Sequence, residues 1–172
     1  MPNSATISPV IIDTLYEEAL QLADRARAAF DLSSAAQDSA WPVRGPKDLA
    51  GDPAGDADER SMARIALSCE ALRTTTRMMH AMAWLLNHRA YFRGELSAFQ
   101  LRRFGRLPKE QAPGPAAELA VLDAQTRALV DRTIAFYRRL ARLDVAFQRS
   151  FAMEPPALDR LRHRIDRAFP AF

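Results

Sequence analysis

Two histidines, His80 and His88, have the clearest potential for metal chemistry in the segment TTTRMMHAMAWLLNHRA. Eight positions apart on a helix, they lie near one side but about 12 Å from each other. No Glu or Asp stands three or four residues from either histidine, so the HExxH and ExxH spacings of helical metal sites are absent. We therefore expect solvent-facing or interhelical histidines, and neither a metal ion nor a cofactor.

Cys69 is the only cysteine, which excludes an internal disulfide and a zinc site built from four thiolates. We expect it to be a buried, inert thiol in a reducing, cytoplasmic setting. The sequence has no GxSxG, P-loop or GxGxxG motif, and its carboxylates are scattered over positions expected to face solvent. No catalytic residue is predicted, and the chain is not expected to be an enzyme.

The stretch from Arg89 to Lys109 is strongly basic and contains one acid, Glu95. Its arginines are Arg89, Arg93, Arg102, Arg103 and Arg106. Interleaved with aromatic side chains, such a patch suits an acidic partner or a phosphate backbone, whereas the plainer interpretation is a solvated end of a bundle. The net charge of +3 is too small to indicate a nucleic-acid binder by itself, so a nucleic-acid-associated regulator is the alternative function.

Apolar periodicity predicts helices over about residues 9–32, 58–93 and 115–151. Ser8 and Pro9 form a favourable helix start, and Gly94 is expected to end the second helix. Ser97 and Gln100 form a capping box for a short helix before the proline-rich segment LPKEQAPGP. Residues 33–57 have no period and are expected to form a loop, and residues 1–8 a mobile N-terminus.

The second predicted helix has the most regular apolar seam in the chain. It runs through Met62, Ile65, Cys69, Leu72, Thr76, Met79, Ala83, Leu86 and Ala90. The third predicted helix repeats this rhythm, and the first has a shorter seam. Two long seams joined by a proline-rich turn predict an all-α fold, an antiparallel three-helix bundle over residues 9–153. The apolar run MMHAMAWLL is far short of the roughly 20 residues that a membrane helix needs.

A second apolar stripe lies about 100° around the second predicted helix from the seam. It consists of Met78, Met82 and Leu85, together with Trp84. This stripe either packs against the third helix or forms a dimer or partner face, where adaptable methionine side chains are common.

Residues 154–172 follow a diproline and form an amphipathic segment, which we expect to be a mobile tail with latent helical character. The side chains expected to contact partners are Leu158, Leu161, Arg162, Ile165 and Phe169.

The segment TTRMMHAMAWLLNHRAYFRGEL, residues 75–96, resembles the signature of the alphaproteobacterial DUF1465 family, the family of the regulator of CtrA degradation. The matching pattern combines a hydroxyl residue, Thr-Arg and Met, a small-Trp-Leu-Leu core, an Arg-Ala pair and Gly-Glu. The matching residues are Thr75, Arg77, Met79, Ala83, Trp84, Leu85, Leu86, Arg89, Ala90, Gly94 and Glu95. The likeness extends more loosely over YEEALQLADRARAAF and LDAQTRALVDRTIAFYRRLARLD.

The resemblance implies a dimeric three-helix bundle that serves as a non-enzymatic adaptor. It also implies binding to a ClpXP-type protease primed by a response regulator, and delivery of cell-cycle regulatory proteins for degradation. Further adaptors can dock on such a protein, and recruitment to a cell pole is a further expectation. Tethering raises the substrate concentration at the protease and needs docking surfaces, not catalytic residues.

Overall fold

The computed structural model describes residues 8–39, 53–110 and 112–153, and these residues are entirely helical or irregular. The elements are α1 (Pro9–Ser39), α2 (Pro53–Phe92), α3 (Ala98–Phe104), α4 (Ala116–Ala120) and α5 (Ala124–Met153). The all-α prediction is confirmed for this part of the chain. The predicted tail and most of the predicted loop lie outside the described residues. None of the described helices is both long enough and apolar enough to cross a membrane.

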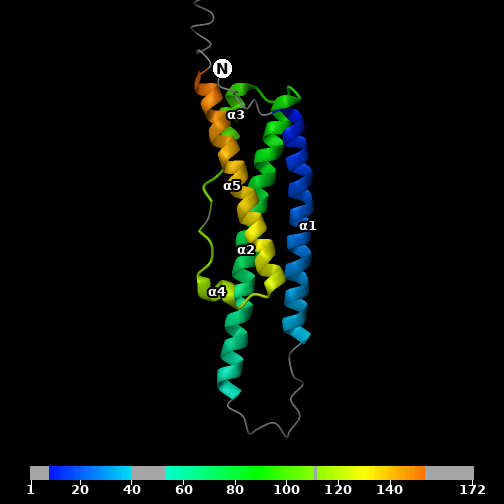
Figure 1. Ribbon diagram of the computed structural model, residues 1–172, viewed down its shortest axis with the longest axis vertical. Coiled ribbons are helices and arrows are strands. Elements are labelled where there is room, and N and C mark those ends of the chain that lie inside the picture. The colour runs from blue at the N-terminus through cyan, green and yellow to red at the C-terminus, as the bar shows by residue number, and fades with distance from the viewer. Residues whose placement is uncertain (1–7, 40–52, 111, 154–172) are drawn as a thin grey trace, which may run out of the picture.

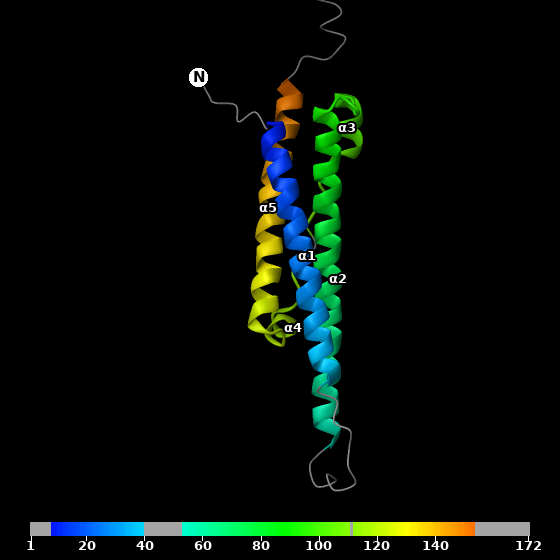
Figure 2. The ribbon, with the colours of Figure 1, turned by 90° about the vertical axis from the view of Figure 1, so that its right-hand side faces the viewer.

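Three long helices, α1, α2 and α5, lie side by side and make an elongated molecule (Figures 1 and 2). The helix α1 is antiparallel to α2, because Arg89 near the end of α2 pairs with Asp13 near the start of α1, and Figure 1 shows α5 also running opposite to α1. The helices α2 and α5 run in the same direction instead. Arg77 meets Thr133, and farther along both helices Trp84 meets Asp144.

The parallel arrangement of α2 and α5 corrects the predicted antiparallel return between these two helices. Residues 105–110 and 112–115 do not form a tight turn but descend along the bundle to α4, as Figure 1 shows. Eleven extended residues reach at most about 38 Å, which is enough to return the chain to the level at which α5 begins. Tyr137 holds this crossover in place by donating a hydrogen bond from its hydroxyl to the carbonyl of Pro108 at 2.7 Å. Burial raises the pKa of Tyr137 to about 12, so the hydroxyl keeps its proton at neutral pH.

The helix ends are set by capping residues that lie next to them in the sequence. The backbone N–H of Ile11 donates to the Ser8 hydroxyl at 3.4 Å, and Ser97 and Gln100 form the predicted capping box of α3. Gly94, with a φ of +78°, ends α2 in the left-handed conformation that glycine adopts without strain.

Three predicted boundaries differ from the structure. The first helix extends to Ser39, and the second begins at Pro53. The third predicted helix is interrupted after Ala120, and α5 begins only after Asp123, whose carboxylate accepts a hydrogen bond from the N–H of Thr126 at 2.8 Å. Hydrogen bonds from the Thr126 hydroxyl and backbone lower the pKa of Asp123, which keeps this cap ionised.

The hydrophobic core runs along the axis between the three long helices. Its largest fully buried apolar or aromatic side chains are Ile12, Trp84, Leu85, Leu101, Tyr137 and Leu140. All three long helices and α3 contribute to it, so these four helices share one continuous core.

Candidate interaction surfaces

The face of α2 predicted as a possible dimer or partner surface lies inside the bundle. Met78, Trp84 and Leu85 are buried, and Met82 is half-buried against the core. Of the two interpretations of this stripe, packing against neighbouring helices is therefore the correct one, and its assignment as a free partner face is wrong. Trp84 fixes the orientation, because its indole N–H donates to Asp144 of α5 at 2.9 Å.

The seam predicted to be the core of the second helix is largely exposed. Its large side chains have the following exposed fractions: Met62 64%, Ile65 56%, Leu72 69%, Met79 65% and Leu86 47%. Cys69 lies half-buried on this stripe, so the prediction of a buried thiol is also wrong. We call Met62, Ile65, Leu72, Met79 and Leu86 the outer stripe. Figure 2 shows α1 and α5 on one side of α2, with the opposite side free of long helices.

The prediction placed the outer stripe in the core and gave the buried stripe as a possible partner face, because both stripes repeat in steps of three and four residues. They are offset by one position, as at Met78 and Met79 or Leu85 and Leu86, which rotates them by about 100°. The buried stripe includes polar residues, among them Glu70, whereas the outer stripe is almost wholly apolar. Periodicity alone therefore favoured the wrong stripe as the core.

A buried polar cluster joins α2 to α5. Glu70 and Arg77, both of α2, are almost fully buried, with 3.7 Å between Glu70 Oε1 and Arg77 Nη2. Arg77 Nη1 also donates to the hydroxyls of Thr133 at 2.8 Å and Thr74 at 3.3 Å. Burial lowers the pKa of Arg77, and the nearby Glu70 carboxylate opposes that effect. The expectation that all carboxylates face solvent is thus wrong for Glu70.

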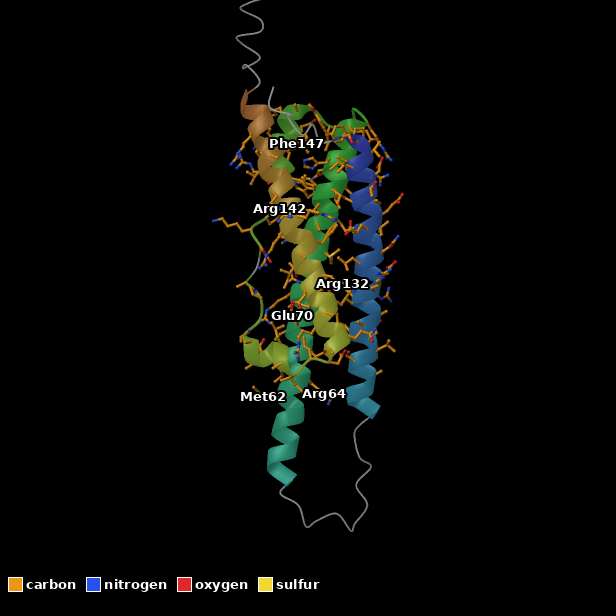
Figure 3. All side chains as sticks on the ribbon, in the orientation of Figure 1. Met62, Arg64, Glu70, Arg132, Arg142 and Phe147 are labelled. Atoms are coloured by element: carbon orange, nitrogen blue, oxygen red, sulfur yellow. The ribbon has the colours of Figure 1, made fainter. Side chains whose placement is uncertain are left out.

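The same cluster reaches the crossover through Arg73. Its guanidinium donates to Glu118 of α4 at 2.9 Å and lies 3.5 Å from Glu70. A Cβ at Gly114 would stand 2.6 Å from the Arg73 guanidinium, so a larger residue at this position would displace the end of the Arg73 side chain. Figure 3 labels Glu70 in the middle of the bundle. Glu70 and Arg77 form the buried part of the cluster, whereas Arg73 and Glu118 are partly exposed, and together these contacts hold α5 and α4 against α2.

His88 is an interhelical histidine. It is buried between Trp84, with ring centroids 3.8 Å apart, and Phe147 of α5, with centroids 4.8 Å apart. Because a carbonyl oxygen only accepts, Nδ1 carries the proton that bonds the Trp84 carbonyl at 2.8 Å. Burial lowers the pKa of His88. His80 is half-buried, and no group of three metal-ligating side chains occurs in the described residues.

The predicted basic patch lies where α2 ends and α3 begins, but its arginines are not equivalent. Arg89 pairs with Asp13 at 2.7 Å and lies over the Tyr16 ring at 4.3 Å, so its charge is already balanced. Arg93, Arg102 and Arg106 are exposed. The remaining patch residue, Arg103, lies 5.4 Å from the ring centroid of Phe104. Phe99 and Phe104 are exposed on the same short helix. The patch is therefore a basic and aromatic surface at one end of the molecule.

A groove between α1 and α5 was not predicted from the sequence. It has a volume of about 430 Å³, and its charged lining residues are Glu18, Arg25, Arg132, Arg139 and Arg142. The repeat of arginines at 132, 139 and 142 on α5 is visible in the sequence, but its significance depends on Arg25 facing it from α1. The tail residues predicted to contact partners lie outside the described residues.

Comparison with known proteins gives one match. The model of the family described as protein of unknown function (DUF1465) matches residues 3–169. No curated protein and no solved structure matches significantly. The match spans α1 to α5 and includes the signature around Trp84 that first suggested this family. The chain therefore belongs to the DUF1465 family.

Proposed function

We propose that this protein is a non-enzymatic adaptor that binds a primed AAA+ protease complex of the ClpXP type and delivers cell-cycle regulatory proteins for degradation. The observation that carries the proposal is the outer stripe, five large apolar side chains on a helix that already has a complete buried face. An apolar patch of this kind on an elongated scaffold is typical of a protein whose work is docking. Membership of the DUF1465 family supports the same role through the resemblance to the regulator of CtrA degradation.

In this proposal the outer stripe forms the homodimer contact. Ile65, Leu72, Met79 and Leu86 repeat at intervals of seven residues, the spacing with which helices of two chains interdigitate. The dimer would leave the basic patch of Arg93, Arg102 and Arg106 free for the protease complex or its response regulator. We place the protein in the cytoplasm, where these partners act, with recruitment to a cell pole as part of the proposal.

The adaptor role is tested by a degradation assay with a purified ClpXP-type protease, its priming response regulator and a panel of cell-cycle regulatory proteins. The panel includes a substrate that the protease accepts from a related adaptor. We expect the intact chain to accelerate degradation of at least one substrate. A chain ending at Glu154 tests whether residues 155–172 grip the substrate. Unchanged degradation of every substrate with the intact chain would refute the adaptor role.

A second candidate is a nucleic-acid-associated regulator. The exposed Phe99 and Phe104 beside Arg102 and Arg106 favour it, because aromatic rings stack on bases while arginines bind phosphates. Binding to DNA would weaken steeply as salt rises. Absence of DNA binding at about 50 mM salt would remove this candidate.

A further inference from the structure

We propose that the groove between α1 and α5 is a docking site for a short acidic segment of a protein partner. This surface is separate from the outer stripe and from the basic patch at α3. The proposal goes beyond the adaptor role, since it names a site and the chemistry of its occupant. Binding is measured on this chain alone, so it can fail or succeed independently of any protease.

In one part of the groove an arginine faces another arginine instead of an acid. Glu18 of α1 pairs with Arg139 of α5. Because α1 and α5 are antiparallel, one heptad forward from Glu18 and one heptad back from Arg139 lead to Arg25 and Arg132. These two arginines, from opposite walls, line the same groove. Glu18 balances the charge of Arg139, but one heptad along the groove Arg25 takes the place of the acid and faces Arg132.

Within the part of the chain that the structure describes, the exposed arginines of the groove have no ion-pair partner. Among the described residues, no carboxylate lies within ion-pair distance of Arg25, Arg132 or Arg142, all of which are exposed. Two guanidinium groups on facing walls repel each other unless an anion lies between them. Figure 3 labels Arg132 and Arg142 at different levels of α5, and ten residues of helix separate them by about 15 Å.

The shape of the groove favours a peptide over a small phosphorylated molecule. Its lining comes from the middle turns of two long helices, where backbone N–H groups are already bonded within the helix. A phosphate would be held only by exposed arginine side chains, without the fixed N–H donors of a phosphate loop. Carboxylates spaced along a peptide match guanidinium groups spaced along α5, and each such pair is a charge-assisted hydrogen bond.

The surroundings of the groove favour a short acidic segment over a nucleic acid. The helix α1 exposes more acids than arginines, and its exposed acids are Asp13, Glu17, Glu18, Asp24 and Asp31. A phosphate backbone that continued beyond the groove would meet these carboxylates and be repelled. A segment with three or four carboxylates ends before it reaches most of them.

The test uses a rhodamine-labelled peptide, Ala-Glu-Glu-Ala-Glu-Glu-Ala, titrated with the full chain and followed by fluorescence anisotropy. We expect saturable binding that weakens with added salt, because the contact is between charges partly exposed to water. The double variant R25E/R132E should weaken binding at least about tenfold. The matched control R93E/R102E, with the same change of charge on the basic patch, should change it less than about twofold.

Three controls keep the result interpretable. The milder variant R132Q should weaken binding in the same direction, and melting temperatures show that each variant folds. Equal binding of the glutamine version of the peptide would overturn the proposal. So would equal loss in the two double variants, or displacement of the peptide by a single-stranded DNA 12-mer at lower concentration than by unlabelled peptide.

Discussion

The two faces of α2 differ by one residue in register and almost completely in environment. Met78 and Leu85 are in the core, whereas Met79 and Leu86 are exposed on the outer stripe. The inner face contains a buried Glu, Arg and His, and the outer face is more uniformly apolar. The comparison shows that the purest apolar stripe of a helix is not necessarily its core face. In this protein the core face also carries buried polar residues, and Arg77 and His88 each make hydrogen bonds there.

The largest expected effect comes from separating the buried pair of Glu70 and Arg77. The substitution R77M leaves the Glu70 charge in the core with the more exposed Arg73 as its remaining cationic partner, and should lower the free energy of unfolding by about 3–5 kcal/mol. Urea denaturation followed by circular dichroism measures it. The double variant E70L/R77M should recover most of the loss, because it removes both charges. A single variant as stable as the original protein would contradict the role of this pair.

Adjacent leucines on the two faces should respond differently to truncation. L85A removes a fully buried side chain and should cost about 2–5 kcal/mol at every protein concentration. L86A should cost less than about 1 kcal/mol when the protein is dilute, and more only at concentrations at which dimers form. Denaturation measured at two protein concentrations distinguishes them. A larger loss for L86A than for L85A in dilute protein would reverse the assignment of the two faces.

A smaller loss of stability is expected when the pH is lowered, because His88 is buried on the inner face of α2. The folded-state pKa of His88 lies below its ordinary value of 6.5, so the unfolded chain binds the proton more tightly. Its contribution to stability is complete above pH 6.5 and is lost as the pH falls below that value, with a limiting slope of about 1.4 kcal/mol per pH unit.

The variant H88F should flatten this part of the pH dependence of stability, because it removes the buried imidazole. Denaturation between pH 5 and pH 7.5 measures the slope. An equal slope in H88F and the original protein would show that another group is responsible.

The sequence predicted the elements well and their faces poorly. The cap at Ser8, the end of α2 at Gly94 and the capping box of α3 depend on residues a few positions apart, so local chemistry was sufficient. The direction of α5 depends on contacts such as Tyr137 with Pro108 and Arg77 with Thr133, which join distant segments. No local pattern distinguishes a tight turn from a crossover that is held in place by such contacts.

The candidate surfaces show the same limit. The basic patch near α3 was predicted because its arginines are close in sequence. The ion pair between Arg89 and Asp13, which lie far apart in the sequence, was not predicted. The groove needs Arg25 and Arg132 on neighbouring helices, a juxtaposition set by the packing of α1 against α5. The outer stripe was seen as a pattern but placed in the core, because burial depends on where the partner helices lie.

The most direct test of the outer stripe as a docking face is the mass of the protein in solution, measured by sedimentation velocity across a range of concentrations. We predict a dimer for the original chain and a folded monomer for L72E/M79E. The matched control V10E/L32E, which changes two equally exposed apolar residues of α1, should remain dimeric. A monomeric original chain at all concentrations, or an L72E/M79E variant that stays dimeric, would contradict the account.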